Sequence, residues 1–390
     1  MRILFIIGQP YVIGGTEHQL VRLARMLTDA GHPTRVHVMV GTGALTALMD
    51  QNGVAYTAPV QGAVVQYLEN HCGIQGRRGA FLFSRWRVDW SLRKSVKKFQ
   101  PDIVHAFLPG CIADGLPIVR RTNRRVVRVA GIRGVTPVPS NVIGSFGMRR
   151  SLEARMQESL GSCDAVVVNA PHLVETETRR LGVPDNRVHV IPNGVNIPCF
   201  QSDPSVEPVR AVVIANFGPY KGHDVLVRAI ARAGVDIKIR MCGIGPMADR
   251  ILDLAREEGI GDRFEIVPPP ADIGEELASS QLAIHPSLTE GLSNAILEEM
   301  AAGLPIICTA VGGATLQVDD GVNGILVPAD DVDALARAIS ALAVDPDLRA
   351  AMGLESRTRA LQFSWAKCLE SHVDLYSSLL RMQRTPSSQI

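Results

Sequence analysis

Cysteine is scarce in this chain and has no pattern. The seven cysteines of the 390-residue sequence are scattered, odd in number and never spaced as C-x-x-C. This distribution offers neither a disulfide framework nor a zinc site, and it fits a reducing compartment. We therefore expect a cytoplasmic protein.

Long apolar runs are also missing. No segment reaches the roughly 18 consecutive apolar residues of a membrane span. The first residues, MRILFIIGQP, contain five consecutive apolar residues before Gly8. That run suits a first strand and is too short for a signal peptide. If the protein meets a membrane, we expect it to do so from the surface.

Neither sign of charge dominates, since the net charge is +1. Aromatic residues make up 5% and apolar residues 46%, which is typical of a soluble α/β protein. The balance hides a basic block, because residues 68–155 hold 17 Lys and Arg against five acids. Such a block can attract phosphate groups or an anionic membrane. Nucleic acid is not an expected partner, because no recognition fold accompanies the charge.

The segment at residues 80–99, AFLFSRWRVDWSLRKSVKKF, is both basic and aromatic. On a helix, Phe83, Trp86, Trp90 and Phe99 fall roughly along one face. Two interpretations stay open. The helix could lie on an anionic bilayer, which would suit a lipid-linked acceptor. Alternatively, it packs on a sheet and presents a cationic face to solvent.

Short apolar runs alternate with helical patterns, which indicates parallel sheets covered on both faces. Strands are predicted at residues 2–7, 33–40, 101–107, 124–131, 164–169, 211–215, 237–243, 263–270, 281–287 and 305–310. Helices are predicted at 15–31, 221–234, 247–259, 295–303 and 365–381. The Pro- and Ser-rich residues 201–208 are interpreted as a linker between two domains.

The most informative stretch is HPSLTEGLSNAILEEMAAGLPIICTAVGG, residues 285–313. It predicts a strand, a loop with Glu290, and a helix that contains Glu298, is capped by Ser293 or Asn294 and stops at Gly303. Free backbone N–H groups at such a helix start suit an anion or hydroxyl groups. A carboxylate can accept hydrogen bonds from a diol. The combination predicts a nucleotide-sugar pocket.

This segment resembles the Glu-x7-Glu signature of glycosyltransferase family 4, retaining enzymes of the GT-B fold. The resemblance extends over nearly the whole chain. It implies two Rossmann-like, doubly wound α/β domains that face each other across a cleft. Residues 1–200, with a returning helix at about 365–382, would bind the acceptor, and residues 201–364 would bind the nucleotide sugar. It further implies that Glu298 binds the ribose diol. Glu290 would hold the donor sugar together with the backbone of Gly291, Leu292, Ser293 and Asn294.

Other family elements concern the donor's phosphates. Gly14 and Gly15, in GGTE, resemble the family's GGxE element near the donor phosphates. Lys221, in PYKGHD, is expected to stabilise the leaving diphosphate. The family pairs this lysine with an arginine five residues earlier, where this chain has Asn216. Arg133 of the first domain is a hypothetical replacement for that missing cation.

Further candidates follow from the same resemblance. Gly243 and Gly245, in CGIGP, match the family's GxGP turn beside the nucleotide, and Val267 falls at its base-binding edge. His105 stands where the family often has His-x-His, although the second position here is Phe107. His105 is therefore either catalytic or a capping histidine in the core.

The sequence thus predicts a retaining glycosyltransferase without cofactor or catalytic metal, because no Asp-x-Asp pair has a suitable setting. The donor would be a nucleoside diphosphate sugar, with UDP or GDP expected. The acceptor would be a sugar or lipid-linked sugar in polysaccharide or glycoconjugate synthesis, reached on the cytoplasmic side of the membrane. Two alternatives remain: an epimerase of the same fold, and a catalytically silent binding subunit, which the changes at Asn216 and Phe107 would favour.

Overall fold

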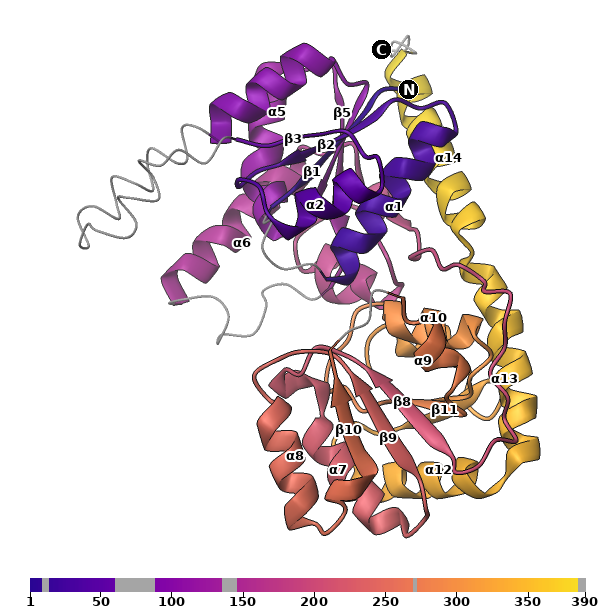
Figure 1. Ribbon diagram of the computed structural model, residues 1–390. Coiled ribbons are helices and arrows are strands. Elements are labelled where there is room, and N and C mark those ends of the chain that lie inside the picture. Colours follow the sequence, from indigo (N-terminus) through magenta and orange to yellow (C-terminus); the bar gives the residue numbers. More distant parts are fainter. Residues whose placement is uncertain (9–13, 60–87, 135–145, 269–271, 385–390) are drawn as a thin grey trace. The chain divides into compact units, whose positions relative to one another are not determined.

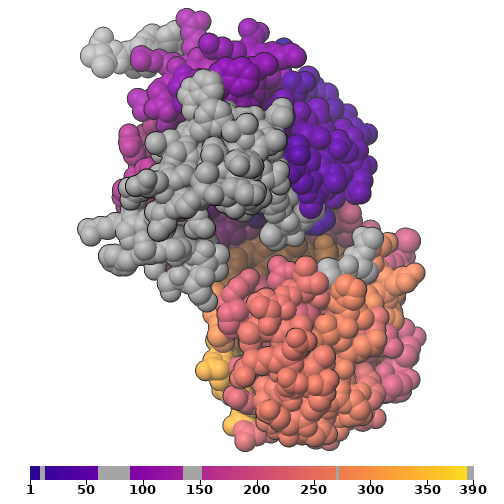
Figure 2. Space-filling view, turned by 60° about the vertical axis from the view of Figure 1, so that its left-hand side comes forward, coloured from indigo at the N-terminus to yellow at the C-terminus, as the bar shows by residue number. Residues whose placement is uncertain are grey.

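The computed structural model describes residues 1–8, 14–59, 88–134, 146–268 and 272–384 (Figure 1). The chain folds into two units, each built around a sheet of its own. Unit 1 consists of Met1–Ile191 and Leu369–Ile390, and unit 2 of Pro192–Cys368. In the space-filling view, the second half of the chain forms a continuous body, coloured rose to orange (Figure 2).

Unit 1 contains a seven-stranded sheet in the order β3-β2-β1-β4-β5-β6-β7, and all its paired strands are parallel. This order reverses direction beside β1, as in a doubly wound fold. The strands are β1 (Ile3–Ile7), β2 (Thr34–Val38), β3 (Tyr56–Thr57), β4 (Ile103–Phe107), β5 (Val127–Ile132), β6 (Ala165–Val168) and β7 (Val188–Val190).

Helices cover both faces of this sheet. They are α1 (Gly15–Asp29), α2 (Ala44–Gln51), an unlabelled helix over residues 88–99, α5 (Leu116–Thr122), α6 (Phe146–Gly161) and α14 (Trp365–Arg384). One face of β4 contributes Val104 and Ala106 to a core shared with the helix at 88–99, α5 and α6. The opposite face carries His105, which reaches Tyr376 of α14. The buried strands therefore need apolar residues on both sides.

Unit 2 contains a six-stranded parallel sheet in the order β10-β9-β8-β11-β12-β13. Its strands are β8 (Arg210–Ile214), β9 (Lys238–Cys242), β10 (Phe264–Val267), β11 (Leu282–His285), β12 (Ile306–Thr309) and β13 (Gly324–Val327). Its helices are α7 (His223–Ala233), α8 (Ala248–Glu257), α9 (Gly274–Ala278), α10 (Asn294–Ala301), α11 (Ala314–Gln317), α12 (Val332–Val344) and α13 (Pro346–Ala360). Helices α7, α8 and α12 share one core with β8 and β9.

Each strand predicted from the sequence overlaps a strand of the structure, and each predicted helix overlaps a helix. The predicted linker at 201–208 is hydrogen-bonded to other parts of unit 2. Ser202 N donates to Ala302 O at 3.0 Å, and Gln281 Nε2 donates to Asp203 O at 3.3 Å. The preceding residues are held in the same way, because Arg357 donates to Pro198 O and Phe200 O. Unit 2 begins at Pro192, whereas the sequence predicts a second domain from residue 201.

The expected aromatic face at 80–99 is also not formed as predicted. Phe83 and Trp86 lie outside the described residues. Phe99 is buried, between the guanidinium groups of Arg2 and Arg35, each 5.0 Å from the ring centroid. Trp90 is 54% exposed. The two rings therefore belong to different sides of the helix, and the buried side is formed by Leu92, Val96 and Phe99.

Within the described residues, no helix combines the length and the apolar composition needed to cross a bilayer.

Unit 2 contains a fully buried arginine that holds backbone carbonyl groups. Arg349, on α13, donates to Pro204 O, Leu342 O and Ala343 O, each at 2.8 Å. These carbonyls come from the segment after β7 and from the end of α12. Arg349 therefore links α13 to the end of α12 and to the segment after β7. Its charge is compensated chiefly by peptide dipoles and by the carboxylate of Glu207 at 3.3 Å.

We predict that Arg349→Met destabilises unit 2 by about 3 kcal/mol or more, because it leaves several buried carbonyl groups without a hydrogen-bond donor. Arg337→Met, at an exposed position on α12, is the control and should change stability by less than about 0.5 kcal/mol. Urea unfolding followed by circular dichroism measures both. Equal midpoints for the two variants would contradict this role of Arg349.

Candidate functional site

The signature segment forms the predicted strand, loop and helix at the carboxyl end of the unit 2 sheet. Strand β11 ends at His285, and α10 begins at Asn294 with Ser293 as its N-cap. The Ser293 Oγ accepts a hydrogen bond from Ile296 N at 3.4 Å, as expected for a capping serine. The backbone at Ser293 is also fixed by Gln317, whose side chain accepts from Ser293 N and donates to Ser293 O.

Lys221 and Glu290 form an ion pair at the centre of this region. The Nζ of Lys221 lies 2.7 Å from Oε2 of Glu290, and both side chains are about one-sixth exposed, at 15% and 17%. Lys221 ends the short 3-10 turn Pro219–Lys221 after β8, and Glu290 lies in the loop after β11. Because β8 and β11 are neighbours in the sheet, their carboxyl-end loops meet. The structure thus brings together the two residues predicted to act on the donor's phosphate and sugar.

Two glycines allow these loops to approach so closely. Gly222 has φ +66°, and a Cβ placed there would lie 1.9 Å from Pro286 O. Gly312 has φ +56°, and its Cβ would lie 1.9 Å from Glu290 O. Both positions combine a left-handed backbone with direct backbone contact, so only glycine fits them without displacement. The loop that carries Glu290 is therefore held on both sides by neighbouring main chain.

Asn193 contacts the start of α10 and was not predicted from the sequence. Its Nδ2 donates to Asn294 Oδ1 at 2.7 Å and lies 3.4 Å from Leu292 O. Asn193 is buried in unit 2 and orients the side chain at the first position of α10. The only available indication was its place in IPNG after β7. A contact across about a hundred residues cannot be inferred from that.

Three ionisable groups lie behind the loop. Glu298, on the second turn of α10, is half-buried, and burial, with a smaller effect of Glu299, raises its pKa to about 7. Glu299 is fully buried and bonds to His285 Nε2 at 2.5 Å. Burial raises the pKa of Glu299, while His285 partly opposes that shift. The His285–Glu299 pair links β11 to α10, so Glu298 is presented by an anchored helix.

The second cluster of predicted residues lies at the ends of β8, β9 and β10. Gly243 N donates to Val267 O at 3.0 Å. A Cβ on Gly245 would meet the backbone of Phe217 at 2.5 Å. Asn216 lies in the same region and is exposed. The predicted nucleotide-binding residues of unit 2 therefore share one edge of its sheet, although their roles stay predictions.

In unit 1, the GGTE element starts α1. The Glu17 carboxylate accepts a hydrogen bond from Gly14 N at 3.0 Å, and Gly15 is the first helical residue. Glu17 thus satisfies one of the free donors at this helix start. The remaining first-turn amides lie at the carboxyl edge of the sheet, where the expected phosphate contact would occur.

His105 lies in the interior of unit 1. Its side chain is fully buried, Nδ1 lies 2.7 Å from the Tyr376 hydroxyl, and its ring stacks on Phe107 at 4.2 Å. Burial, aided by His372 and Arg133, lowers the pKa of His105 well below its ordinary value. This setting supports the interpretation of His105 as a capping histidine in the core. The guanidinium group of Arg133 lies over the ring of Phe107, 4.9 Å from its centroid.

No group of three or more His, Cys, Asp or Glu side chains in the described ranges is arranged to hold a metal ion. The site instead offers one cation, two carboxylates and backbone amides. Such groups can bind a diphosphate and sugar hydroxyls by charge-assisted hydrogen bonds.

Two family models match successive parts of the chain. The model described as "Glycosyltransferase Family 4" matches residues 13–197, and "Glycosyl transferases group 1" matches residues 200–359. Together they take in most of the sequence. The first match falls almost wholly in unit 1, and the second lies within unit 2.

The chain is also similar to several D-inositol 3-phosphate glycosyltransferases. The protein from Saccharomonospora viridis is 28% identical over 303 residues, which cover 71% of this chain and 68% of the relative. The protein from Corynebacterium kroppenstedtii is 30% identical over 251 residues, which cover 58% of this chain and 55% of that relative. The chain therefore spans between about half and two thirds of the length of these relatives.

Solved structures share the fold. HepE of Anabaena, determined in complex with UDP, has a TM-score of 0.80 at 19% identity, covering 97% of this chain and all of that one. Sucrose-phosphate synthase from Thermosynechococcus elongatus has a TM-score of 0.79 at 19% identity, covering 98% of this chain and all of that one. At such identities the likeness shows the fold alone.

The raised pKa of Glu298 predicts a dependence of stability on pH. Between its ordinary value of 4.5 and about 7, folded Glu298 binds more protons than the unfolded chain. The free energy of unfolding contributed by Glu298 should therefore fall as pH rises through this window. Glu298→Gln cannot titrate, so wild type should lose stability relative to this variant between pH 5 and pH 7. Thermal midpoints measured across this range test the prediction, and parallel curves would contradict it.

Proposed function

Because the chain belongs to glycosyltransferase family 4, a retaining family with the GT-B fold, we propose that it transfers a sugar from a nucleoside diphosphate sugar to an acceptor hydroxyl with retention of anomeric configuration. The observation that carries this proposal is the meeting of Lys221 with Glu290 at 2.7 Å beside the start of α10. The family resemblance assigns to these two residues the leaving diphosphate and the transferred sugar.

The ion pair suggests how the donor is accommodated. Without donor, each of the two side chains neutralises the other in a setting with little solvent. A diphosphate offers Lys221 a partner of greater charge, and Glu290 is then free to accept hydrogen bonds from sugar hydroxyls. Lys221 stabilises the charge that develops as the bond to the diphosphate breaks. The donor phosphate takes the acceptor's proton, so this scheme needs no contribution from buried His105.

Glu298 and the start of α10 complete the proposed donor site. The carboxylate of Glu298 accepts hydrogen bonds from the two hydroxyls of the ribose, and the backbone from Gly291 to Asn294 binds the sugar. UDP is the preferred nucleotide in this proposal, supported by the UDP and UDP-glucose complexes of HepE. GDP is the alternative.

The acceptor is proposed to be a sugar, a phosphorylated polyol or a lipid-linked sugar. The name of the D-inositol 3-phosphate relatives supports a phosphorylated polyol. The basic block of unit 1 supports a phosphate-bearing acceptor or contact with an anionic membrane surface from the cytoplasmic side. Synthesis of polysaccharides or glycoconjugates is the proposed context.

A catalytically silent nucleotide-sugar-binding subunit is the second candidate. It is favoured by one observation: the uncharged, exposed Asn216 at the position of the family's second cation. Such a subunit would bind the nucleotide without turnover of any acceptor, whereas an epimerase would convert the donor with no acceptor present.

We predict that UDP raises the melting temperature of the wild type more than GDP, ADP or TDP. At a concentration one hundred times the dissociation constant, the added stability is about 2.7 kcal/mol. Glu298→Ala should abolish this effect, since the ribose loses its acceptor. Glu258→Ala, at the exposed C-cap residue that follows α8, is the matched control and should retain it. If no nucleotide stabilises the protein near millimolar concentration, the donor-site assignment is wrong.

A second prediction concerns catalysis. Lys221→Ala should lower kcat about 100-fold or more, as found when a charge-stabilising donor is removed. Lys221→Arg should recover part of this loss, because the positive charge is retained. Lys238→Ala, at a lysine outside the site whose side chain is 44% exposed, should leave kcat unchanged. Hydrolysis-corrected release of UDP in the presence of acceptor measures all three. An unaltered kcat in Lys221→Ala would remove Lys221 from the proposed mechanism.

A further inference from the structure

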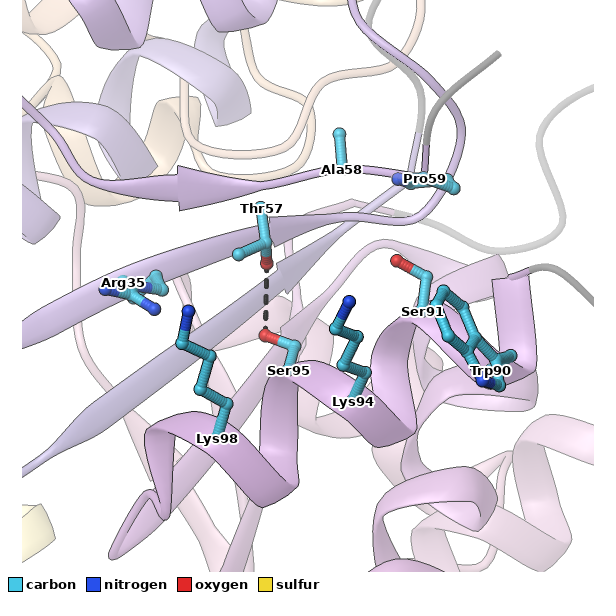
Figure 3. Close-up of a pocket in the computed structure, with 9 residues that line it drawn as sticks. All are labelled: Arg35, Thr57, Ala58, Pro59, Trp90, Ser91, Lys94, Ser95 and Lys98. Atoms are coloured by element: carbon cyan, nitrogen blue, oxygen red, sulfur yellow. Dashed lines mark hydrogen bonds between the residues drawn. The ribbon is translucent and has the colours of Figure 1, made fainter. Parts of the chain in front are cut away.

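A pocket lies in unit 1 along the edge of the sheet, between β3 and the helix over residues 88–99 (Figure 3). Its volume is about 290 Å³. Lys94, Lys98 and Arg35 contribute positive charge, Thr57, Ser91 and Ser95 contribute hydroxyl groups, and Trp90 contributes an aromatic ring. Glu298, Glu290 and Lys221, which are proposed to bind the donor, belong to unit 2, so this pocket is not part of that proposed site.

The charges in the pocket are of one sign. Lys94 and Lys98 are one helical turn apart, so their like charges repel. In Figure 3 both amino groups point from the helix toward the strands, and the guanidinium group of Arg35 lies nearby. The carboxylate of Asp89 on the same helix is already paired with Arg93. Across the described ranges, none of the three cations takes part in an ion pair, which leaves an arrangement that an anion would stabilise.

The floor of the pocket is polar but uncharged. Thr57 Oγ1 lies 3.0 Å from Ser95 Oγ and 2.9 Å from His37 Nδ1. Burial lowers the pKa of His37 to about 4, so the imidazole is neutral near pH 7. This chain of hydrogen bonds holds the hydroxyl of Thr57 at the pocket surface (Figure 3). These bonds leave at most one O–H group of Thr57 and Ser95 for a ligand, and Ser91 adds a further hydroxyl group to the pocket.

Trp90 adds an apolar surface at one end of the pocket. Its side chain is 54% exposed, and Lys94 Nζ lies 4.9 Å from the ring centroid. An exposed tryptophan beside cations suits a ligand that is anionic at one end and ring-shaped at the other, because the electron-rich face attracts the C–H groups of a saccharide. A simple inorganic anion would not use this surface.

We infer that the pocket binds a phosphorylated sugar or cyclic polyol. The phosphate lies among Arg35, Lys94 and Lys98, and the ring lies against Trp90. The ligand is either free in solution or the same group carried as a lipid headgroup. Binding at this pocket does not depend on the donor site, so the inference stands or falls separately from the proposed transfer.

The test compares four variants of the full chain with the wild type, by isothermal titration at low salt with inositol 1-phosphate, inositol and inorganic phosphate. Lys94→Glu/Lys98→Glu should weaken binding of inositol 1-phosphate at least tenfold. Lys97→Glu makes one such substitution at an exposed position of the same helix that does not line the pocket, and it should change the affinity less than twofold. Glu298→Ala should bind the phosphorylated ligand like the wild type, which distinguishes this pocket from the donor site.

Trp90→Ala tests the contact with the ring. It should reduce the preference for inositol 1-phosphate over inorganic phosphate without altering phosphate binding. If Lys97→Glu weakens the binding of inositol 1-phosphate as much as Lys94→Glu/Lys98→Glu does, general surface charge explains the binding. That result would overturn the inference. Absence of any preference for the sugar-like phosphate in the wild type would do the same. Retained UDP stabilisation in both charge variants would show that they fold.

Co-sedimentation with vesicles identifies the source of the ligand. If wild type and Lys97→Glu bind phosphatidylinositol vesicles more than phosphatidylserine vesicles, and Lys94→Glu/Lys98→Glu loses that preference, the ligand is a lipid headgroup. Binding of inositol 1-phosphate without such a preference identifies a soluble ligand. If the wild type binds neither inositol 1-phosphate nor phosphatidylinositol vesicles, the inference is overturned.

Discussion

The contact between Lys221 and Glu290 is the interaction on which the arrangement of the unit 2 site depends. The two residues are 69 positions apart in the chain, yet they come from adjacent strands of one sheet. Their loops are also joined through main chain, because Leu288 N donates to Tyr220 O at 2.8 Å. Desolvation offsets much of the attraction within a shielded ion pair. The pair therefore contributes more to the placement of a cation beside a carboxylate than to global stability.

Below that pair, unit 2 uses buried polar groups to fix the helix that carries Glu298. Gln317 holds both backbone groups of Ser293, and His285 bonds to Glu299 on the buried side of α10. Each of these bonds lies in an interior where an unpaired polar group is costly. The start of α10 is consequently defined from two directions, by its cap and by its neighbouring strand. Preorganisation of this kind is what a site needs to stabilise developing charge.

Much of this architecture could be predicted from the sequence, because buried parallel strands require apolar residues on both faces and such runs are easy to detect. The cap at Ser293 was likewise predictable from local chemistry. The junction near Pro192 was not, since the bonds of residues 192–208 to unit 2 leave no trace in a Pro- and Ser-rich composition. Helix α13 was missed although Asp345 and Pro346 mark its start. Asn193 and Gln317 act through distant partners, which spacing along the chain cannot reveal.

The close contacts at Gly222 and Gly312 have a consequence for how this family can diversify. The loop between them keeps its shape through backbone packing, so its shape does not require particular side chains at its outer positions. Leu288 is 43% exposed and Thr289 is also exposed, and neither is needed to hold the loop in place. Evolution can therefore exchange such residues one at a time while the frame around Glu290 survives. A rigid main-chain frame with replaceable side chains allows one scaffold to acquire new sugar preferences by small steps.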